Sequence, residues 1–471
     1  MERLHGKSRD MGTFDIGVLG LGVMGSSLAG NLIDHHYNTA LFSREESERK
    51  AFRQNHPGSG YQIFDMLHEF TLSLKRPRKI LLMITAGNAV DQVIASLIPL
   101  MEPDDILMDG GNSHFSDTNR RVDFLREKNI AFLGIGISGG EKGARTGPSM
   151  MVGGDQKSWF VCSELLQSIA ARADGQPCCN YVGQHGAGHY VKMVHNGIEY
   201  GILQLIAEAY SFLRQALGMS TGQAAVVFKD WKDSELASYL IDTAAVVLEK
   251  KDDDGQSLVD KIKDVAAQKG TGQWTLKDAV ERGVYVPVIY EAVGVRSFSE
   301  NRMQIPNSSS HAPESPDAAL LDSLKQALYL AILCCYDQGL TLIRSASGDL
   351  PAPIHLADTV ALWKAGCIIR SEVLVNIESV LRVQPAQCIL DSAEFQNHPV
   401  LAAALRDIVI KSVRHEVSVP ALCASLSYYD ALRTDVLPVS LIQGMRDCFG
   451  AHTYERTDRE GVFHTQWEED R

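Results

Sequence analysis

Short apolar runs alternate with glycine-containing turns along the first third of the chain. Residues 16–19 form one run, followed by GLGVMG, an apolar helical segment from about Ser26 to Asp34, and a second run that ends near Phe42. Further runs occur in KILLMITAG, DILMDGGNS and IAFLGIGISGG, each followed by glycine or small residues. Strands that alternate with helices predict a doubly wound parallel sheet. We therefore expect an α/β, Rossmann-like N-terminal domain over residues 14–186.

The hydrophobic period changes to that of helices after about residue 187. Helical periodicity continues through Leu217 and recurs over residues 223–228, 235–250, 258–267, 317–344, 355–383, 402–417 and 420–432. The pattern predicts a larger all-helical domain over residues 187–443, with an exposed loop rich in Pro and Ser at 303–317. We expect residues 1–13 to form a polar N-terminal extension and residues 444–471 an extended C-terminal tail.

The stretch GHYVKMVHNGIEYG at the start of the helical part places polar and ionisable residues among apolar residues suited to a protein core. At about 100° per residue, one helical face carries four polar or ionisable side chains: Lys192, His195, Asn196 and Glu199. The other faces are apolar, which predicts a buried helix whose polar face looks into a cavity or a partner. The alternative is a solvated stripe with one Lys–Glu pair, but Gly188 and Gly197 indicate a close backbone approach that a surface helix does not need.

A glycine motif lies where the first predicted strand ends. Gly20, Gly22 and Gly25 complete GxGxxG in a strand–turn–helix setting. Their roles would be the tight turn, close approach of the backbone to a diphosphate at the helix N-terminus, and helix–strand packing. With both flanking strands at the right spacing, the motif predicts dinucleotide binding.

The residues after the second strand bear on the choice of cofactor. An acidic residue there would bind the ribose 2′-hydroxyl of NAD, whereas an arginine accommodates the 2′-phosphate of NADP. The chain has Ser43, Arg44 and Glu45 at this point. Arg44 favours NADP and Ser43 can donate to a phosphate, while Glu45 is an adverse charge that we expect to point away as the next helix begins. These residues favour NADP and leave NAD open.

Composition narrows the class of protein. The chain has 471 residues, of which 45% are hydrophobic and 22% charged, which is typical of a soluble protein with two or three domains. A net charge of −13 argues against nucleic acid or a membrane surface as the main partner. Nine cysteines without CxxC or ordered Cys/His spacing suggest reduced thiols and no metal site. With no apolar run of membrane-spanning length and no signal peptide, we expect a cytoplasmic protein.

Motifs along nearly the whole chain resemble those of one family. In order they are GLGVMG, DGGNS, ISGGEKGARTGPSMM, GHYVKMVHNGIEYG, QKGTGQWT, GCIIRS, LPVSLIQGMRDCFGAHTYE and VFHTQW. Over about residues 14–468 the chain resembles the decarboxylating 6-phosphogluconate dehydrogenases. KMVHNGIEYG and FGAHTYE are far more specific than any glycine pattern. The resemblance implies an NADP-dependent oxidoreductase of the pentose phosphate pathway and of gluconate utilization, which converts 6-phosphogluconate to ribulose 5-phosphate and CO2.

The resemblance also implies the catalytic residues. Lys192 would be the general base that takes the proton of the substrate's 3-hydroxyl as hydride leaves C3, which requires a neutral amine and a lowered pKa. After loss of CO2, Glu199 would be the acid that protonates C1 of the enediol, which requires a raised pKa. No metal is needed for these steps.

Binding residues follow from the same motifs. For the substrate's carboxylate and hydroxyls, the resemblance implies Asn112, Ser138, Gly139, Gly140, His195 and Asn196. For its phosphate, it implies Tyr200, Lys269, Arg296, Arg446 and His452. Arg446 and His452 would come from the tail of the partner subunit, so the active form would be a homodimer with tail exchange. For NADP, it implies Gly20, Leu21, Gly22, Val23, Met24, Gly25, Ser43, Arg44, Glu45, Ile84, Thr85, Ala86 and Asn112.

The chain departs from the family pattern at several charged positions. Ser43-Arg44-Glu45 replaces the usual Asn-Arg-Thr, and the other departures are Thr85 and Gln273 for lysines, Ile202 for an aspartate and Lys142 for an acidic residue. None of them removes a catalytic group. Charges lost near the cofactor would weaken its binding or change the pKa of Lys192.

Two other functions compete with this interpretation. One is a different β-hydroxyacid dehydrogenase acting on a smaller acid, which would not need the cations expected to bind phosphate. The other is a cofactor-binding scaffold or regulatory paralogue with weak chemistry. The altered charges favour the scaffold, and the presence of both Lys192 and Glu199 argues against it.

Overall fold

The computed structural model of the chain describes residues 12–268, 270–303, 305, 311–348, 352–385 and 388–467. The chain forms two compact units, residues 1–425 and 426–471. Most of the predicted N-terminal extension lies outside the described residues, and so does Lys269.

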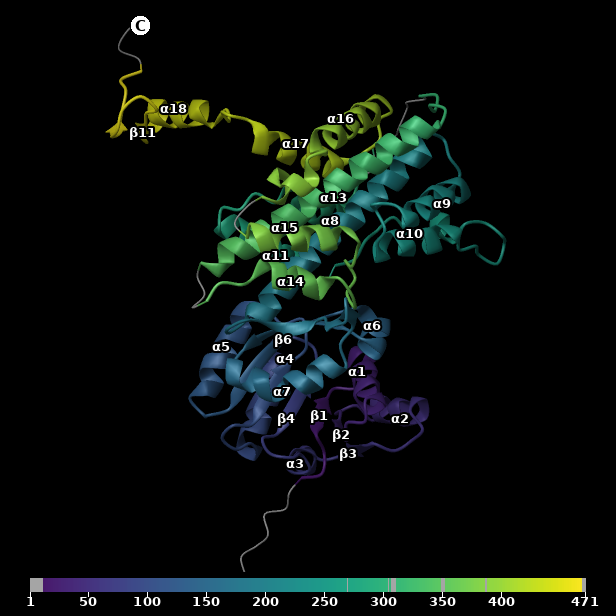
Figure 1. Cartoon of the computed structure of the whole chain (residues 1–471), viewed down its shortest axis with the longest axis vertical. Helices are drawn as coiled ribbons and strands as arrows, with labels where there is room; N and C mark the ends of the chain where they lie inside the picture. The colour runs from purple at the N-terminus through teal and green to yellow at the C-terminus, as the bar shows by residue number, and fades with distance from the viewer. Residues whose placement is uncertain are drawn as a thin grey trace, which may run out of the picture. The chain divides into compact units, whose positions relative to one another are not determined.

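The first half of the first unit contains an eight-stranded sheet in the order β10-β7-β6-β5-β4-β1-β2-β3 among the described residues (Figure 1). Its strands are β1 (Ile16–Leu19), β2 (Thr39–Phe42), β3 (Tyr61–Phe64), β4 (Lys79–Leu82), β5 (Ile106–Asp109), β6 (Ala131–Ser138), β7 (Ser149–Gly154) and β10 (Cys179–Gly183). The six strands β3, β2, β1, β4, β5 and β6, neighbours in this order, pair in parallel, while β7 runs antiparallel to β6. The order β3-β2-β1-β4-β5-β6 is that of a dinucleotide-binding domain, which confirms the predicted doubly wound architecture.

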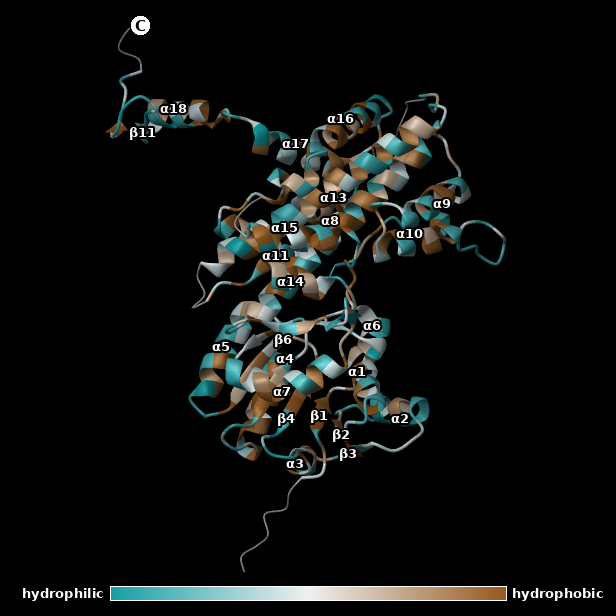
Figure 2. Cartoon of the chain, in the orientation of Figure 1, coloured by the Kyte–Doolittle hydropathy of each residue, from teal (hydrophilic) through white to brown (hydrophobic). Residues whose placement is uncertain are grey.

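Helices cover both faces of the sheet. They are α1 (Val23–Asp34), α2 (Glu46–Asn55), α3 (Leu67–Leu72), α4 (Asn88–Leu97), α5 (Phe115–Arg126), α6 (Gly140–Thr146) and α7 (Gln156–Ser168). Two apolar clusters fill the space between sheet and helices, and Figure 2 shows the hydrophobic residues of β1 and β4 inside this domain. Because β1, β2, β4 and β5 are buried on both faces, each reads as a continuous apolar run. Strand β3 is half-exposed and has no such run, so the sequence pattern did not reveal it.

The helical part begins at α8 (Ala187–Gln215), which packs beside α13 (Ala318–Ser347). Around them lie α9 (Thr221–Asp230), α10 (Tyr239–Glu249), α11 (Thr271–Glu281), α12 (Pro287–Asn301), α14 (Leu356–Trp363), α15 (Val373–Val383) and α16 (His398–Arg414). Helix α17 (Pro420–Arg433) begins in the first unit and ends in the second. By length and composition α13 alone among the described helices could cross a membrane, but it packs between α8 and α16 and 61% of its most apolar window is buried. It therefore serves as a core helix.

Some expected helices differ in the structure. The expected helix over 258–267 is only a short 3-10 turn at Leu258–Lys261. Ile262 and Val265 are 60% and 52% exposed, so its apolar stripe finds no packing surface to stabilise a helix. The expected helix over 355–383 is two helices, α14 and α15, separated by the GCIIRS segment. The pattern also did not predict α11 and α12.

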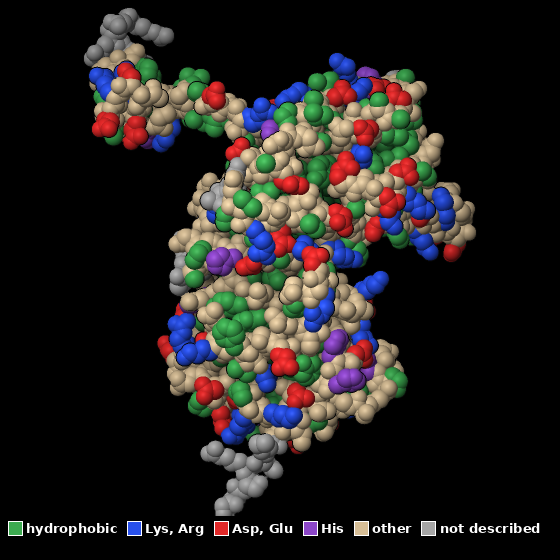
Figure 3. All heavy atoms as spheres, viewed as in Figure 1, with side chains coloured by type: hydrophobic (Ala, Val, Ile, Leu, Met, Phe, Trp, Pro, Cys, Tyr) green, Lys and Arg blue, Asp and Glu red, His purple; other side chains and the backbone are tan. Residues whose placement is uncertain are grey.

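The second unit contains α18 (Val439–Gly450) and a two-stranded ribbon of β11 (Tyr454–Glu455) and β12 (Val462–Phe463). The buried Asp447 carboxylate organises it by accepting hydrogen bonds from the Thr453 and Thr465 backbone N–H groups, Trp467 Nε1 and His464 Nδ1 at 2.8–3.0 Å. The expected tail boundary between residues 443 and 444 falls inside α18. On the face of the molecule in Figure 3, acidic and basic side chains are interspersed.

Candidate active site

The first turns of α8 press directly onto the nucleotide-binding sheet. A Cβ on Gly188 would lie 2.3 Å from the carbonyl oxygen of Gly134 in β6, and a Cβ on Gly136 would lie 2.4 Å from the Cβ of Lys192. Only glycine allows this approach, because any side chain would overlap backbone atoms. The glycines therefore bring Lys192 against the strand that ends at Ser138.

The four polar residues predicted on one face of α8 form a contact chain. Lys192 Nζ lies 3.5 Å from His195 Nδ1, which lies 3.3 Å from the Asn196 side-chain oxygen and 4.0 Å from a Glu199 oxygen. On its other side, His195 Nε2 lies 3.3 Å from the Ser138 hydroxyl at the end of β6. Lys192 and His195 are 8% and 0% exposed, so the polar face is not a solvated stripe.

Burial shifts the pKa values of these groups in the directions that acid–base chemistry requires. Burial lowers the pKa of Lys192, while the charges of Glu199 and Cys367 partly oppose the change. Burial and the positive charge of Lys192 together hold the pKa of His195 well below its ordinary value, so the imidazole is neutral. Burial raises the pKa of Glu199 against the opposing effect of Lys192 and Arg296. The site thus holds an amine inclined to lose its proton and a carboxyl inclined to keep one.

The GCIIRS segment between α14 and α15 packs against the end of β6. Gly366 has a φ of +69°, and its carbonyl oxygen accepts a hydrogen bond from the Ser149 N–H at 3.0 Å. The same oxygen would lie 2.4 Å from a Cβ on Gly139, which itself has a φ of +121°. Gly140 also has a positive φ, and nothing lies within 4 Å of its Cβ position. Ser138, Gly139 and Gly140 therefore form a narrow turn that presents backbone beside the polar face of α8.

The predicted phosphate-binding residues fall into three groups. Arg296 on α12 stacks over the Tyr200 ring of α8, with 3.7 Å between the guanidinium carbon and the ring centroid. Tyr200 follows Glu199 in sequence. Lys269 lies outside the described residues. Arg446 and His452 belong to the second unit, where Arg446 Nη1 donates to the Gln443 side-chain oxygen at 3.0 Å. The first unit thus brings one arginine to the four-residue cluster, and the role of the tail residues stays a prediction.

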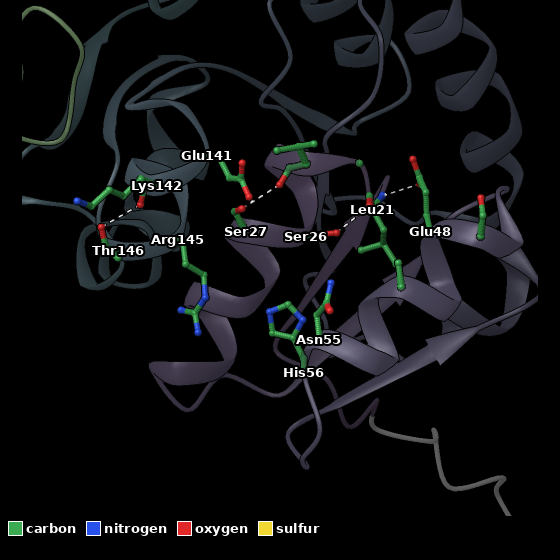
Figure 4. Close-up of a pocket in the computed structure, with 14 residues that line it drawn as sticks. Leu21, Ser26, Ser27, Glu48, Asn55, His56, Glu141, Lys142, Arg145 and Thr146 are labelled. Carbon is green, nitrogen blue, oxygen red and sulfur yellow. Dashed lines mark hydrogen bonds between the residues drawn. The ribbon is translucent and has the colours of Figure 1, made fainter. Parts of the chain in front are cut away.

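A cavity of about 910 Å³ opens beside the glycine turn (Figure 4). Leu21, Gly22 and Val23 line it, and no side chain caps the N-terminus of α1. A Cβ on Gly22 would meet no atom closer than 3.6 Å, so its backbone is open to a ligand, whereas Gly25 is pressed against the Gly20 carbonyl. Free helix N–H groups beside an open glycine suit a diphosphate. Met24 follows in the first turn of the same helix.

The other predicted cofactor residues lie on the loops that follow β4 and β5. Ile84, Thr85 and Ala86 lie in the loop between β4 and α4, and Asn112 is exposed in the loop between β5 and α5. Buried Arg121 joins the two loops, because it donates to the Gly87 carbonyl at 3.0 Å and to the Ser113 hydroxyl at 3.3 Å. Loops at the carboxyl ends of neighbouring parallel strands meet at the ligand edge of such a sheet.

His189, one turn before Lys192, was not singled out from the sequence. Its Nε2 lies 3.1 Å from the Asp109 carbonyl oxygen, which only accepts, so Nε2 carries the proton. Its Nδ1 then accepts from the Thr118 hydroxyl at 2.7 Å. The histidine is 2% exposed, and burial lowers its pKa. His189 therefore ties α8 to the β5 strand end; its place in the GHYVKMVHN motif was the available signal.

The end of β2 differs in one respect from the sequence prediction. Ser43 is buried, while Arg44 and Glu45 are exposed, and Glu45 is the N-cap residue of α2, where the next helix begins. A carboxylate that contacts the glycine turn is that of Glu48, in the first turn of α2. Its Oε2 accepts from the Ser43 hydroxyl at 2.6 Å and from the Leu21 N–H at 3.2 Å. Sequence reasoning missed Glu48 because it considered only the residues directly after the strand.

Comparisons with known proteins agree with this geometry. Residues 15–183 match the family model for the NAD binding domain of 6-phosphogluconate dehydrogenase, and residues 188–467 match the model for its C-terminal domain. Proteins of Staphylococcus epidermidis and Staphylococcus aureus named 6-phosphogluconate dehydrogenase, decarboxylating, are each 44% identical over 454 residues. Each alignment covers 94% of this chain and 97% of the relative.

A solved structure gives the same result. The Plasmodium falciparum 6-phosphogluconate dehydrogenase, described in its apo form and in complex with NADP+ and with 6-phosphogluconate, superimposes with a TM-score of 0.92 at 35% identity. The match covers 96% of this chain and 100% of that one. The resemblance expected from the motifs is confirmed: the chain belongs to the 6-phosphogluconate dehydrogenase family.

Proposed function

We propose that the protein catalyses the oxidative decarboxylation of 6-phosphogluconate to ribulose 5-phosphate and CO2, with reduction of NADP. The observation that carries the proposal is the pairing of buried Lys192 with partly buried Glu199 on one face of α8, with their pKa values shifted in opposite directions. The relatives and the Plasmodium structure support the substrate and the cofactor, because their names and titles state them.

Lys192 acts as the general base in this proposal. Its amine takes the proton from the 3-hydroxyl of the substrate, and NADP, when bound, would supply the acceptor for the hydride that leaves C3. Burial lowers the pKa of Lys192 and so favours its neutral form, and His195 beside it, whose pKa lies well below its ordinary value, adds no competing positive charge. Once protonated, Lys192 donates a hydrogen bond to the new C3 ketone, which accepts the electron pair released as the C1 carboxylate leaves as CO2.

Glu199 acts as the acid that completes the reaction. Its protonated carboxyl delivers a proton to C1 of the enediol, which was C2 of the substrate. The Lys192 amine, which gave its proton to the enediol oxygen as CO2 left, takes that proton back when the ketone re-forms. Burial keeps the carboxyl protonated at a pH where an exposed glutamate is ionised. Arg296 on α12, stacked on the Tyr200 ring that follows Glu199 in sequence, would bind the substrate's phosphate.

The residues of the nucleotide-binding half fit NADP. The N-terminus of α1 offers N–H groups to the diphosphate beside the open Gly22. The exposed Arg44 would pair with the 2′-phosphate, and the loop of Ile84 to Ala86 would cover the cofactor. These residues hold and orient the cofactor, while Lys192 and Glu199 move the protons.

We also propose a homodimer in which tails are exchanged, with domains at 14–186, 187–443 and 444–471. On α18 the side chains of Ile442, Met445 and Phe449 are 56%, 53% and 73% exposed in the single chain, which suits a helix that docks on another subunit. Arg446 on the same helix would then reach the partner's substrate. We also propose a cytoplasmic location. An enzyme that acts on a free sugar phosphate suits that compartment, and so do the nine cysteines, all of which are free thiols.

The test is a single assay of purified protein with 6-phosphogluconate and NADP. We expect reduced nicotinamide and CO2 to form together, in equal amounts, and we expect Lys192→Ala to abolish both. A Lys157→Ala variant, which removes an exposed lysine of α7, serves as the matched control. A scaffold without chemistry would give no turnover with NADP or NAD, and that result would overturn the proposal.

A further inference from the structure

The contacts of Glu48 bear on cofactor selection, an aspect that the proposed function leaves open. Glu48 lies in the first turns of α2, and Figure 4 shows its side chain turned toward the backbone of Leu21. One of its oxygens accepts from the glycine turn at Leu21 and from Ser43 at the end of β2. Its carboxylate thus bridges the two elements between which the adenosine ribose of a dinucleotide binds in this fold.

This bridge changes the expected role of Ser43. The sequence suggested that its hydroxyl donates to a 2′-phosphate, but the hydroxyl already donates to Glu48 at 2.6 Å. Nearby Arg49 does not replace it, because Arg49 donates to the Ser43 carbonyl at 2.6 Å and pairs with Asp65. Of the residues at this strand end, Arg44 is the cation left exposed to meet a phosphate.

We propose that Glu48 is the residue that sets the discrimination between NADP and NAD in this chain. Its carboxylate accepts a hydrogen bond from a ribose 2′-hydroxyl, whereas it repels a 2′-phosphate held by Arg44. The carboxylate belongs to α2 rather than to the residues directly after β2, but its side chain lies between the glycine turn and the end of β2. Glu48 therefore weakens the preference for NADP that Arg44 provides. This inference rests on the proposed function only in assuming that the cleft binds a dinucleotide.

The experiment measures binding of two fragments that differ by the 2′-phosphate, adenosine 2′,5′-bisphosphate and adenosine 5′-monophosphate, by calorimetry. Glu48→Gln keeps an oxygen acceptor for Leu21 and Ser43 but removes the charge. We expect it to raise the preference for the bisphosphate about tenfold, which is about 1.4 kcal/mol. Glu48→Ala removes the charge together with the rest of the side chain and should shift the preference in the same direction. Because Glu48→Gln keeps the shape of the side chain, a shift in both variants assigns the effect to the charge.

Glu46→Gln is the matched control, because Glu46 is exposed on the same helix and pairs with Lys50 rather than the glycine turn. An unchanged preference in both Glu48 variants, or an equal change in Glu46→Gln, would overturn the inference. Fragment binding needs no turnover, so it gives an answer even if the assay with 6-phosphogluconate is negative. Parallel kcat/KM values for NADP and NAD should change in the same ratio in an active enzyme.

Discussion

The side-chain nitrogen of Lys192 lies 3.5 Å from Nδ1 of His195, and both groups are buried. A positive charge on the lysine is therefore costly, because it lacks water and lies beside an imidazole that has no charge to offer. The same cost that weakens the fold favours the neutral form of the amine, which is the form that can accept a proton.

Replacing Lys192 with methionine should abolish turnover and raise the Tm by roughly 2 °C or more, since an apolar chain of similar length suits the buried site better. The folded pKa of Lys192 lies below its ordinary value of 10.5, so the unfolded chain binds the proton more readily. The gain in Tm should thus be largest near neutral pH and shrink as the pH rises toward 10.5. Differential scanning calorimetry across that range measures it, and a lower Tm at pH 7 would contradict the explanation.

Glu199→Gln should lower kcat by about 10²- to 10⁴-fold, the usual contribution of an acid catalyst. In the native enzyme the neutral Lys192 accumulates as pH rises through its lowered pKa, whereas protonated Glu199 is lost as pH rises through its raised pKa. The pH profile should therefore be bell-shaped. The variant should keep only the rising limb, while exposed Glu127→Gln should leave the bell unchanged. A falling limb that persists in Glu199→Gln would assign the acid to another group.

Mixing two inactive variants tests tail exchange. Lys192→Ala lacks the base, and Arg446→Ala lacks the tail cation, so each homodimer should be impaired. In a mixed dimer one site combines an intact Lys192 with an intact Arg446 from the other subunit. Statistical reassembly should then restore roughly a quarter of the wild-type activity at low substrate concentration. If each tail served its own subunit, mixing would restore nothing.

His189→Ala should destabilise the fold by about 2 kcal/mol, because it removes two buried hydrogen bonds and leaves a cavity. The folded pKa of His189 is below its ordinary 6.5, so its contribution is complete above that pH and declines as the pH falls below it. Urea unfolding at pH 7.5 and 5.5 should show a smaller difference between variant and wild type at the lower pH. Exposed His68→Ala should behave as wild type at both.

Asp447→Asn should loosen the second unit, since an amide cannot accept all the hydrogen bonds that the carboxylate accepts. Desolvation raises the pKa of Asp447, but the hydrogen bonds from His464, the Thr465 N–H and Trp467 outweigh it and lower the pKa below the ordinary 3.8. The unit should therefore hold above pH 3.8 and open as the pH falls further. Hydrogen exchange at Thr453 and Thr465 reports the opening, with exposed Asp458→Asn as the control.

Local sequence patterns were sufficient to predict an element where the residues that determine it are neighbours in the sequence. Strand β1, the GxGxxG turn and α1 follow each other within twenty residues, so apolar runs and glycine spacing predicted them closely. The polar face of α8 was equally readable, because helical geometry alone brings Lys192, His195 and Glu199 together.

Prediction failed where an element depends on a distant partner. The break between α14 and α15 exists because Gly366 must reach Gly139 and Ser149, far away in sequence. The stripe at Ile262 and Val265 has helical spacing but no surface to cover, so it stays irregular.

By itself the sequence determined the nucleotide-binding architecture, the helical part that follows, and the identity of the groups on α8, because each rests on short-range spacing. Only the tertiary structure decided how those groups behave. Removal from water moves the pKa of Lys192, which lies against β6, and that of Glu199 in opposite directions. The fold also carries Glu48 from a neighbouring helix to the glycine turn, since the placement of a carboxylate depends on packing that no local pattern records.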